Sequence, residues 1–173
     1  DVVPEGMSYN SYLIDDEKIA VMDTADRRKG EEWKQNLKVA LNGRQPDYLV
    51  VHHMEPDHSA LIAWMLETYP GLQLVCSAQA VKMLPNFFEG VNFEGRVMTV
   101  KEGDTLALGK HDLKFIGAAM IHWPEVIMSY DSKDKVLFSA DGFGKFGALV
   151  NETDDWACEA RRYYFNICGK YTS

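Results

Sequence analysis

The stretch HHMEPDHSA, residues 52–60, places three histidines, a glutamate and an aspartate within seven positions. It follows the apolar run YLVV and precedes a helix-like segment, so we expect a strand-end loop, where side chains of a short stretch can converge. Imidazole and carboxylate groups are metal ligands, and here they form two sets, His53 with Glu55 and Asp57 with His58. A polar turn that caps the next helix is the alternative, but four potential ligands in six residues favour a metal site.

Two further candidate ligands are predicted at strand ends. His122 follows the strand-like run LKFIGAAM, and Asp141 follows the strand-like run VLFSA. His52 should point away from His53, because neighbouring side chains of a strand alternate, and it is expected to pack or to support the site. His111 lies in GKHDL between two predicted strands and is expected to be a solvated turn residue.

The elements that must position these residues alternate in type. Short apolar runs predict buried strands, and apolar residues at helical spacing predict helices. The expected strands are 8–14, 18–23, 47–52, 72–77, 96–100, 104–109, 111–117, 126–131 and 135–140. The expected helices are 30–41, 59–69 capped by Ser59, 78–90 ended or kinked by Pro85, and a last helix capped by Thr153. This order predicts an α/β (α+β) fold with helices outside two sheets, an αββα-type sandwich.

Composition narrows the class of protein. The 173 residues, 46% hydrophobic and 25% charged, are typical of one globular domain spanning 1–173. A net charge of -8 without a basic cluster argues against a nucleic-acid surface, and no apolar run has the length of a membrane span. Cys76, Cys158 and Cys168 lack CxxC spacing and are expected to be reduced thiols of a cytoplasmic protein.

Two other kinds of site find little support. GFGKFG (142–147) matches GxGxxG after a strand, but the following ALVNETDD is not a helix start, so a tight loop is expected in place of a dinucleotide site. No serine or cysteine is paired with a spare histidine as a nucleophile would need, so no catalytic residue is expected beyond the metal ligands.

The form H-x-E-x-D-H, with HWPE and SADGFG downstream, resembles the metallo-β-lactamase superfamily. Most zinc hydrolases of that superfamily carry a histidine at the position of Glu55. With glutamate there, the pattern resembles the diiron domain of flavodiiron proteins (A-type flavoproteins). PEGMSYNSYLI and EARRYYFNICGKY are also similar to that family, and the resemblance covers essentially the whole chain.

The resemblance implies a ligand set. By this likeness, His53, Glu55 and His122 would bind one iron, Asp57 and His58 would bind the second, and Asp141 would bridge the two. Asp23 is implied as an acid that braces a loop. The residue chemistry agrees, because a carboxylate at position 55 adds a hard oxygen donor, which suits iron better than zinc.

The resemblance also implies an activity and partners. A flavodiiron oxidoreductase reduces dioxygen to water, nitric oxide to nitrous oxide, or both. Its electrons come from FMN in a flavodoxin-like domain, which a partner subunit supplies in a head-to-tail homodimer. A rubredoxin-like protein or a flavin reductase is the electron donor. No FMN-binding residue is expected in this chain, which carries only the metallo-β-lactamase-like domain.

The chain is expected to be a fragment truncated at both ends. The family has a further histidine ligand on the second iron, whereas no histidine follows His122 here. The isolated chain is therefore expected to be inactive and to bind the second ion poorly. A zinc-dependent, thioesterase-like hydrolase and a non-catalytic metal-binding module remain as alternatives.

Overall fold

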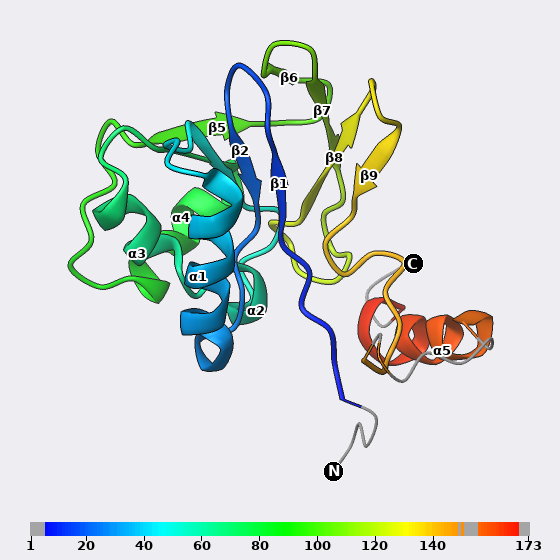
Figure 1. The fold of residues 1–173 in the computed structure, drawn as a ribbon. Coiled ribbons are helices and arrows are strands. Elements are labelled where there is room, and N and C mark those ends of the chain that lie inside the picture. The colour runs from blue at the N-terminus through cyan, green and yellow to red at the C-terminus, as the bar shows by residue number, and fades with distance from the viewer. Residues whose placement is uncertain (1–5, 149, 151–155, 170–173) are drawn as a thin grey trace.

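The computed structural model describes residues 6–148, 150 and 156–169, which form two β-sheets packed face to face with helices on one side (Figure 1). The first sheet has the order β1 (Tyr12–Ile14), β2 (Ala20–Met22), β3 (Tyr48–Val50), β4 (Gln73–Ser77) and β5 (Val97–Val100). Its strands β2 to β5 are parallel, and β1 is antiparallel to β2. The second sheet is antiparallel and has the order β6 (Thr105–Ala107), β7 (Asp112–Gly117), β8 (Ile127–Asp131) and β9 (Val136–Phe138).

The helices are short, and all but the last lie in the connections between the parallel strands. They are a 3-10 turn (Arg27–Lys29), α1 (Gly30–Leu41), α2 (Pro56–Ser59), α3 (Ile62–Thr68), α4 (Ala78–Phe87), and α5 (Trp156–Tyr163) with a π-helical turn at Tyr164–Cys168. Within the described ranges, no helix combines the length and the apolar character that crossing a membrane would require.

Alternation along the central strands builds two hydrophobic cores. In β3 and β4, Leu49 and Leu74 pack in the core shared with the helices, while Val50 and Val75 pack in the core between the sheets. Each of these four side chains is fully buried, as the continuous apolar runs of the two strands predicted. Phe115 of β7, also fully buried, contributes to the core between the sheets from the second sheet.

These layers make three of the four layers of an αββα sandwich. Helices α1, α3 and α4 lie on the first sheet, and the second sheet lies behind it (Figure 1). Helix α5 lies below the end of β9 and away from the outer face of the second sheet. The predicted fold class is therefore confirmed, and the sandwich is incomplete, as expected.

Topology brings the candidate loops to one end of the sandwich. The carboxyl ends of β2, β3 and β4 lie at the same edge of the first sheet because these strands are parallel. In the second sheet, the loop 118–126 between β7 and β8 and the loop that follows β9 reach the same end. The amide of Ile127 donates to the carbonyl oxygen of His52 (3.0 Å), which joins the two sheets there.

Local structure differs from the sequence-based expectation at Ser59 and at Pro85. Ser59 does not cap a helix: it ends α2, and its Oγ donates to the carbonyl oxygens of Met54 (2.7 Å) and Glu55 (3.1 Å). Pro56 begins α2, since the first helical turn needs no proline N–H. Pro85 does not end α4, which continues to Phe87. The expected cap Thr153 lies outside the described residues.

Candidate metal centre

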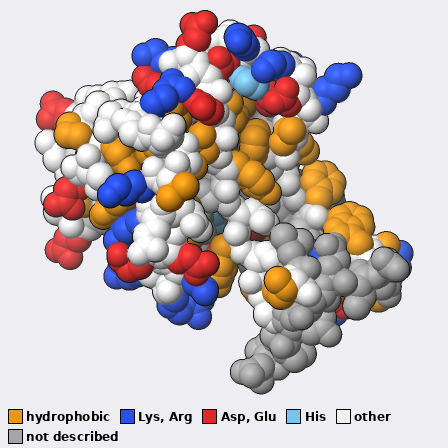
Figure 2. Space-filling model, in the orientation of Figure 1, with side chains coloured by type: hydrophobic (Ala, Val, Ile, Leu, Met, Phe, Trp, Pro, Cys, Tyr) orange, Lys and Arg blue, Asp and Glu red, His pale blue; other side chains and the backbone are white. Residues whose placement is uncertain are grey.

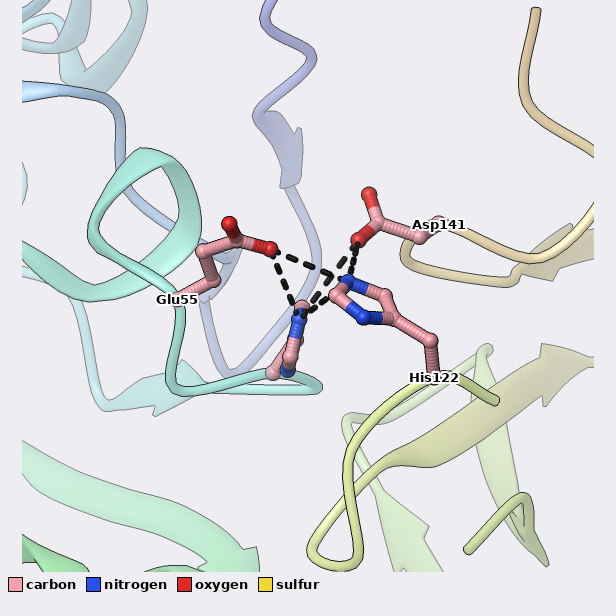
Figure 3. A group of neighbouring side chains, drawn as sticks. Glu55, His122 and Asp141 are labelled. Carbon is pink, nitrogen blue, oxygen red and sulfur yellow. Dashed lines mark hydrogen bonds and ion pairs between the residues drawn. The ribbon is translucent and has the colours of Figure 1, made fainter. Parts of the chain in front are cut away.

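Four donor atoms from three loops meet at the end of the sandwich. Nε2 of His53 lies 3.3 Å from Oε2 of Glu55, 3.3 Å from Nε2 of His122 and 3.5 Å from Oδ2 of Asp141. Nε2 of His122 lies 3.0 Å from Oε2 of Glu55 and 3.0 Å from Oδ2 of Asp141. Figure 3 shows Glu55, His122 and Asp141 pointing toward one another from separate loops. Ligands about 2.1 Å from a tetrahedral ion lie roughly 3.4 Å apart, so this group matches the spacing of a shared ion.

A second group lies beside the first and shares Asp141. Nε2 of His58 is 3.1 Å from Oδ1 of Asp141 and 3.8 Å from Oδ2 of Asp57. The donor atoms of these three residues lie within 4.8 Å of one another. Asp141 therefore presents one carboxylate oxygen to each group, which is the arrangement that a bridging carboxylate needs. The structure brings all six predicted ligand residues together in this way.

Buried acids hold the far side of two of the histidine rings. Nδ1 of His53 lies 2.7 Å from Oε1 of Glu125, and Nδ1 of His58 lies 3.2 Å from Oδ2 of Asp23. Asp23 also accepts the backbone N–H of His52 (2.7 Å), whose own ring lies 3.1 Å from Asp23 and 2.7 Å from Ser129 Oγ. A carboxylate behind a ligand histidine is a common feature of protein metal sites. The supporting roles expected for Asp23 and His52 are thus confirmed.

Glu125 is a functional candidate that the sequence reading did not single out. It belongs to the HWPE motif and lies two residues before β8. The signal in the sequence was a carboxylate placed next to the apolar residues that begin this strand. Its side chain is fully buried. In the same motif, the ring of Trp123 stands edge-on to the ring of His53, with centroids 5.1 Å apart, and excludes water from that side.

The carboxylates concentrate negative charge in the two donor groups, and protons on His53 and His58 balance it. Burial is the largest single influence on His53 and lowers its pKa, but hydrogen bonds with Glu125 and Glu55 outweigh it and raise the pKa to about 9. Burial likewise works against the Asp141 carboxylate, yet the hydrogen bond and charge of His58 lower its pKa to about 2. Burial, together with the neighbouring Asp141 and Glu55 carboxylates, raises the pKa of Asp57. A bound cation would replace the histidine protons as the balancing charge.

The residues present fit a pair of metal ions. Oδ1 of Asp57 is buried and has no hydrogen-bond partner among the described residues, so a carboxylate oxygen is left without a donor inside the site. A buried acceptor of this kind is costly unless it is satisfied, and a metal ion satisfies it. The mixture of imidazole and carboxylate donors is also a chemistry that divalent metals accept.

Access to the second group comes from an open cavity of about 320 Å³. Asp57, His58 and Asp141 line it together with aromatic rings, among them Phe143 and Tyr163. Hydrophobic side chains also gather on the side of the molecule that carries β8 and β9 (Figure 2). Burial, followed by the charge and hydrogen bond of Asp141, raises the pKa of the Tyr163 phenol, so it remains a hydrogen-bond donor at every physiological pH.

The loop GFGKFG closes tightly beside the site. A Cβ at Gly142 would lie 2.5 Å from Cε of Met128, and one at Gly144 would lie 3.0 Å from the ring of Tyr163. A side chain at Gly142 would require Met128 to move, and one at Gly144 would press against the Tyr163 ring of the cavity wall. No helix begins within residues 142–148, so this part of the chain lacks the strand–turn–helix of a dinucleotide site, as predicted.

A further cluster lies at the opposite end, where charged side chains crowd the turns (Figure 2). The prediction that His111 is a solvated turn residue is wrong: it is only 8% exposed. Its Nδ1 lies 2.6 Å from Asp16, and its Nε2 lies 3.2 Å from Asp134 and 3.2 Å from Lys133 Nζ. The lysine ammonium already supplies a cation beside Nε2, so this cluster ties three turns together and needs no metal.

Comparison with known proteins supports the fold and the family. A family model described as "ODP family beta lactamase" matches residues 7–167. The chain is 34% identical to the anaerobic nitric oxide reductase flavorubredoxin of Aliivibrio fischeri over 98% of its length, and 39% identical to the putative diflavin flavoprotein A 2 of Synechocystis over 93%. It covers 35% and 28% of these relatives, respectively, and therefore spans about a third of their length.

Two solved structures have the same fold. The flavodiiron protein of Giardia intestinalis superimposes with a TM-score of 0.84 at 31% identity, over 95% of this chain and 41% of that one. The rubredoxin oxygen:oxidoreductase of Desulfovibrio gigas gives a TM-score of 0.84 at 31% identity, over 98% of this chain and 43% of that one. With the family model, these matches confirm the resemblance seen in the sequence: the chain belongs to the ODP family of β-lactamase-like domains, and flavodiiron proteins are its relatives.

Proposed function

We propose that this chain is the diiron domain, residues 1–173, of a flavodiiron oxidoreductase that reduces dioxygen to water, nitric oxide to nitrous oxide, or both. The observation that carries the proposal is the shared carboxylate of Asp141, with one oxygen in each of two adjacent donor groups. In this proposal His53, Glu55 and His122 hold one iron, and Asp57 and His58 hold the other.

The donor set favours iron over zinc. The six proposed ligands comprise three carboxylates and three imidazoles, and Glu55 stands where a zinc hydrolase would place another imidazole. Hard, anionic oxygen donors stabilise a metal that must carry higher positive charge, as iron does when it cycles between its ferrous and ferric states. When bound, the two irons would supply electrons and open positions for a diatomic gas.

The protein's own residues position and shield that chemistry. The ring of Trp123 packs edge-on against the ring of His53, and the cavity beside Asp57 and His58 is large enough for a small gas to enter. The carboxylates hold charge and position, so the proposed reaction needs no general base. Tyr163 and Asp141 both line the cavity, so a neutral phenol lies beside the shared carboxylate.

The remaining features of the proposal come from the relatives. Their printed names include nitric oxide reductase, flavorubredoxin, diflavin flavoprotein and rubredoxin oxygen:oxidoreductase. These names support a flavin, proposed to be FMN outside residues 1–173, as the electron source, and a rubredoxin-like protein or a flavin reductase as donor. A head-to-tail homodimer is proposed from the family resemblance alone. A cytoplasmic location is also part of the proposal, and the buried thiols of Cys76 and Cys168, both outside any disulfide, agree with a reducing compartment.

A single-turnover experiment tests the proposal. Because residues 1–173 alone are expected to be inactive, the longer protein to which this domain is proposed to belong is loaded anaerobically with ferrous iron, freed of excess metal and mixed with nitric oxide or dioxygen. Nitrous oxide formation and oxygen consumption are then measured. Asp141→Ala serves as the matched control, because it removes the shared carboxylate. Gas reduction that depends on Asp141 is expected. Hydrolysis of a thioester by the zinc-loaded protein, without any gas reduction by the iron-loaded protein, would contradict the proposal in favour of a hydrolase.

A further inference from the structure

Glu125 lies at the junction of the two sheets and contacts the metal centre only through His53. One carboxylate oxygen, Oε1, lies 2.7 Å from Nδ1 of His53 and accepts the backbone N–H of Met54 at 2.9 Å. A single oxygen therefore holds both the ring of His53 and the backbone that leads to Glu55. Both residues belong to the first donor group, so Glu125 sets the position of half of that group.

The backbone of Glu125 is fixed independently of its side chain. Ser77, at the end of β4, donates its Oγ to the carbonyl oxygen of Glu125 at 2.7 Å. Two residues further on, the amide of Ile127 donates to His52. Glu125 is thus held by strand ends of the first sheet while it holds the loop that carries His53.

The chemistry of the contact determines the orientation of the ring. A carboxylate only accepts hydrogen bonds, so Nδ1 of His53 must carry the donated proton, and Nε2 is the nitrogen left for a metal ion. The Glu125 side chain is fully buried, and its second oxygen, Oε2, has no hydrogen-bond partner among the described residues. Its negative charge is therefore poorly screened and acts mainly on His53.

The second group lacks an equivalent dedicated acid. Asp23 lies behind His58 but divides its two oxygens among the backbone and ring of His52 and the ring of His58, and its contact with His58 is longer, at 3.2 Å against 2.7 Å. The first group also offers four donor residues and the second only three.

We infer that Glu125 is a positioning residue for the first metal site, and that by holding His53 it makes this site the one that a metal ion occupies first. The inference rests on the proposed metal centre. It concerns Glu125 acting through His53, without contact between Glu125 and the metal. Removing a carboxylate behind a ligand histidine typically weakens metal binding by about 10-fold to 100-fold.

Cobalt(II) is the probe that tests this inference, because its binding is followed without any enzymatic activity. The chain is titrated with Co²⁺ and its visible absorption is recorded, for the unaltered protein and for Glu125→Gln, which keeps the shape of the side chain but removes its charge. Tighter binding of the first cobalt than of the second is expected, with a loss of about 10-fold to 100-fold for the first ion in Glu125→Gln. Glu125→Asp, which keeps the charge, should recover part of the affinity.

Proton NMR of the cobalt-loaded protein gives a second readout that a merely structural role would not move. The Nδ1–H of His53 should appear as a paramagnetically shifted resonance that disappears in D₂O, and it should change in Glu125→Gln. The Nδ1–H resonance is first sought in the unaltered protein, and this part of the test does not depend on the stability of the variant. Asp131→Asn is the matched control, since Asp131 is a buried carboxylate at the far end of β8.

The possible failures are distinguishable. Equal cobalt affinity and an unchanged Nδ1–H resonance in Glu125→Gln would overturn the inference while leaving the proposed metal centre intact. An equal loss of affinity in Asp131→Asn would also overturn it, because the effect would then be general destabilisation. If the unaltered chain bound no cobalt, the proposed function would fall and the inference with it.

Discussion

Replacing Asp57 by asparagine should stabilise the metal-free protein, although Asp57 is a proposed metal ligand. Its Oδ1 is buried without a hydrogen-bond partner among the described residues, and the Asp141 and Glu55 carboxylates lie nearby. Burial and this repulsion raise the pKa of Asp57. A carboxyl group with a raised pKa in the folded state destabilises that state once the pH exceeds the pKa of the unfolded chain, near 4, and the penalty grows as the pH rises through the folded pKa.

The size of the effect follows from the burial of the side chain. An unsatisfied buried acceptor costs about 1–3 kcal/mol, and because the Asp57 side chain is 27% exposed, the lower part of that range applies. We expect Asp57→Asn to raise the free energy of unfolding of the metal-free protein by about 1–2 kcal/mol at pH 7. For a domain of this size, that corresponds to a rise in Tm of roughly 2–8 °C. The gain should shrink as the pH is lowered toward about 4.

Metal ions should reverse this difference in stability between Asp57→Asn and the unaltered protein. An ion present at about 100 times its Kd adds about 2.7 kcal/mol to the stability of a protein that binds it only when folded. The unaltered protein can take this gain at the second site, whereas Asp57→Asn loses a ligand there. With metal present, the unaltered protein should therefore melt at the higher temperature.

Thermal melts of both proteins with chelator and with added Co²⁺ check the prediction. Asp131→Asn is the control of opposite sign, because the Asp131 carboxylate is buried but accepts the backbone N–H groups of Lys133 (3.2 Å) and Asp134 (3.3 Å). It should lower the Tm under both conditions. A lower Tm for metal-free Asp57→Asn, or equal stabilisation of both proteins by metal, would refute this reasoning about Asp57.

Three further predictions concern the core, the distal cluster and the shared carboxylate. Phe115→Ala should lower the free energy of unfolding by about 3–5 kcal/mol in urea titrations, because Phe115 is fully buried between the sheets; a loss under about 1 kcal/mol would contradict that packing. His111→Asn should cost about 1–2 kcal/mol. The hydrogen bond with Asp16 raises the pKa of His111, so this cost should be full below about pH 6.5 and shrink as the pH rises through the folded pKa; melts that show a constant difference from pH 6 to 9 would argue against it. Asp141→Ala should reduce binding of both metal ions and His122→Ala mainly that of one, as equilibrium dialysis can show; equal losses would count against a bridging role.

Much of the candidate site could be predicted because its residues follow recognisable strands. His53, Glu55, Asp57 and His58 are neighbours in sequence, and a strand-end loop needs no long-range information to bring them together. His122 could be placed because it too follows a strand-like run. Its meeting with Glu55, 67 positions away, depends on the packing of the antiparallel second sheet against the first, and before the structure only the family resemblance implied it.

The features that escaped prediction depend on contacts between distant segments. Glu125 meets His53 across 72 positions, and only the packing of the two sheets brings them together. His111 looked exposed because its own turn is polar, yet Asp16, 95 positions away, covers it. The sequence did not assign the expected strand 96–100 to either sheet, and it pairs in parallel with β4, since pairing is decided by packing and not by position along the chain.

Metal content is the measurement that tests the central claim most directly. The protein is purified anaerobically, without added metal, and its iron and zinc are determined by elemental analysis together with the protein concentration, with Asp141→Ala in parallel. The account predicts iron that depends on Asp141, with the second site filled less completely than the first. Zinc alone, at any stoichiometry and with no iron, would contradict the diiron site and with it the proposed reduction of dioxygen or nitric oxide.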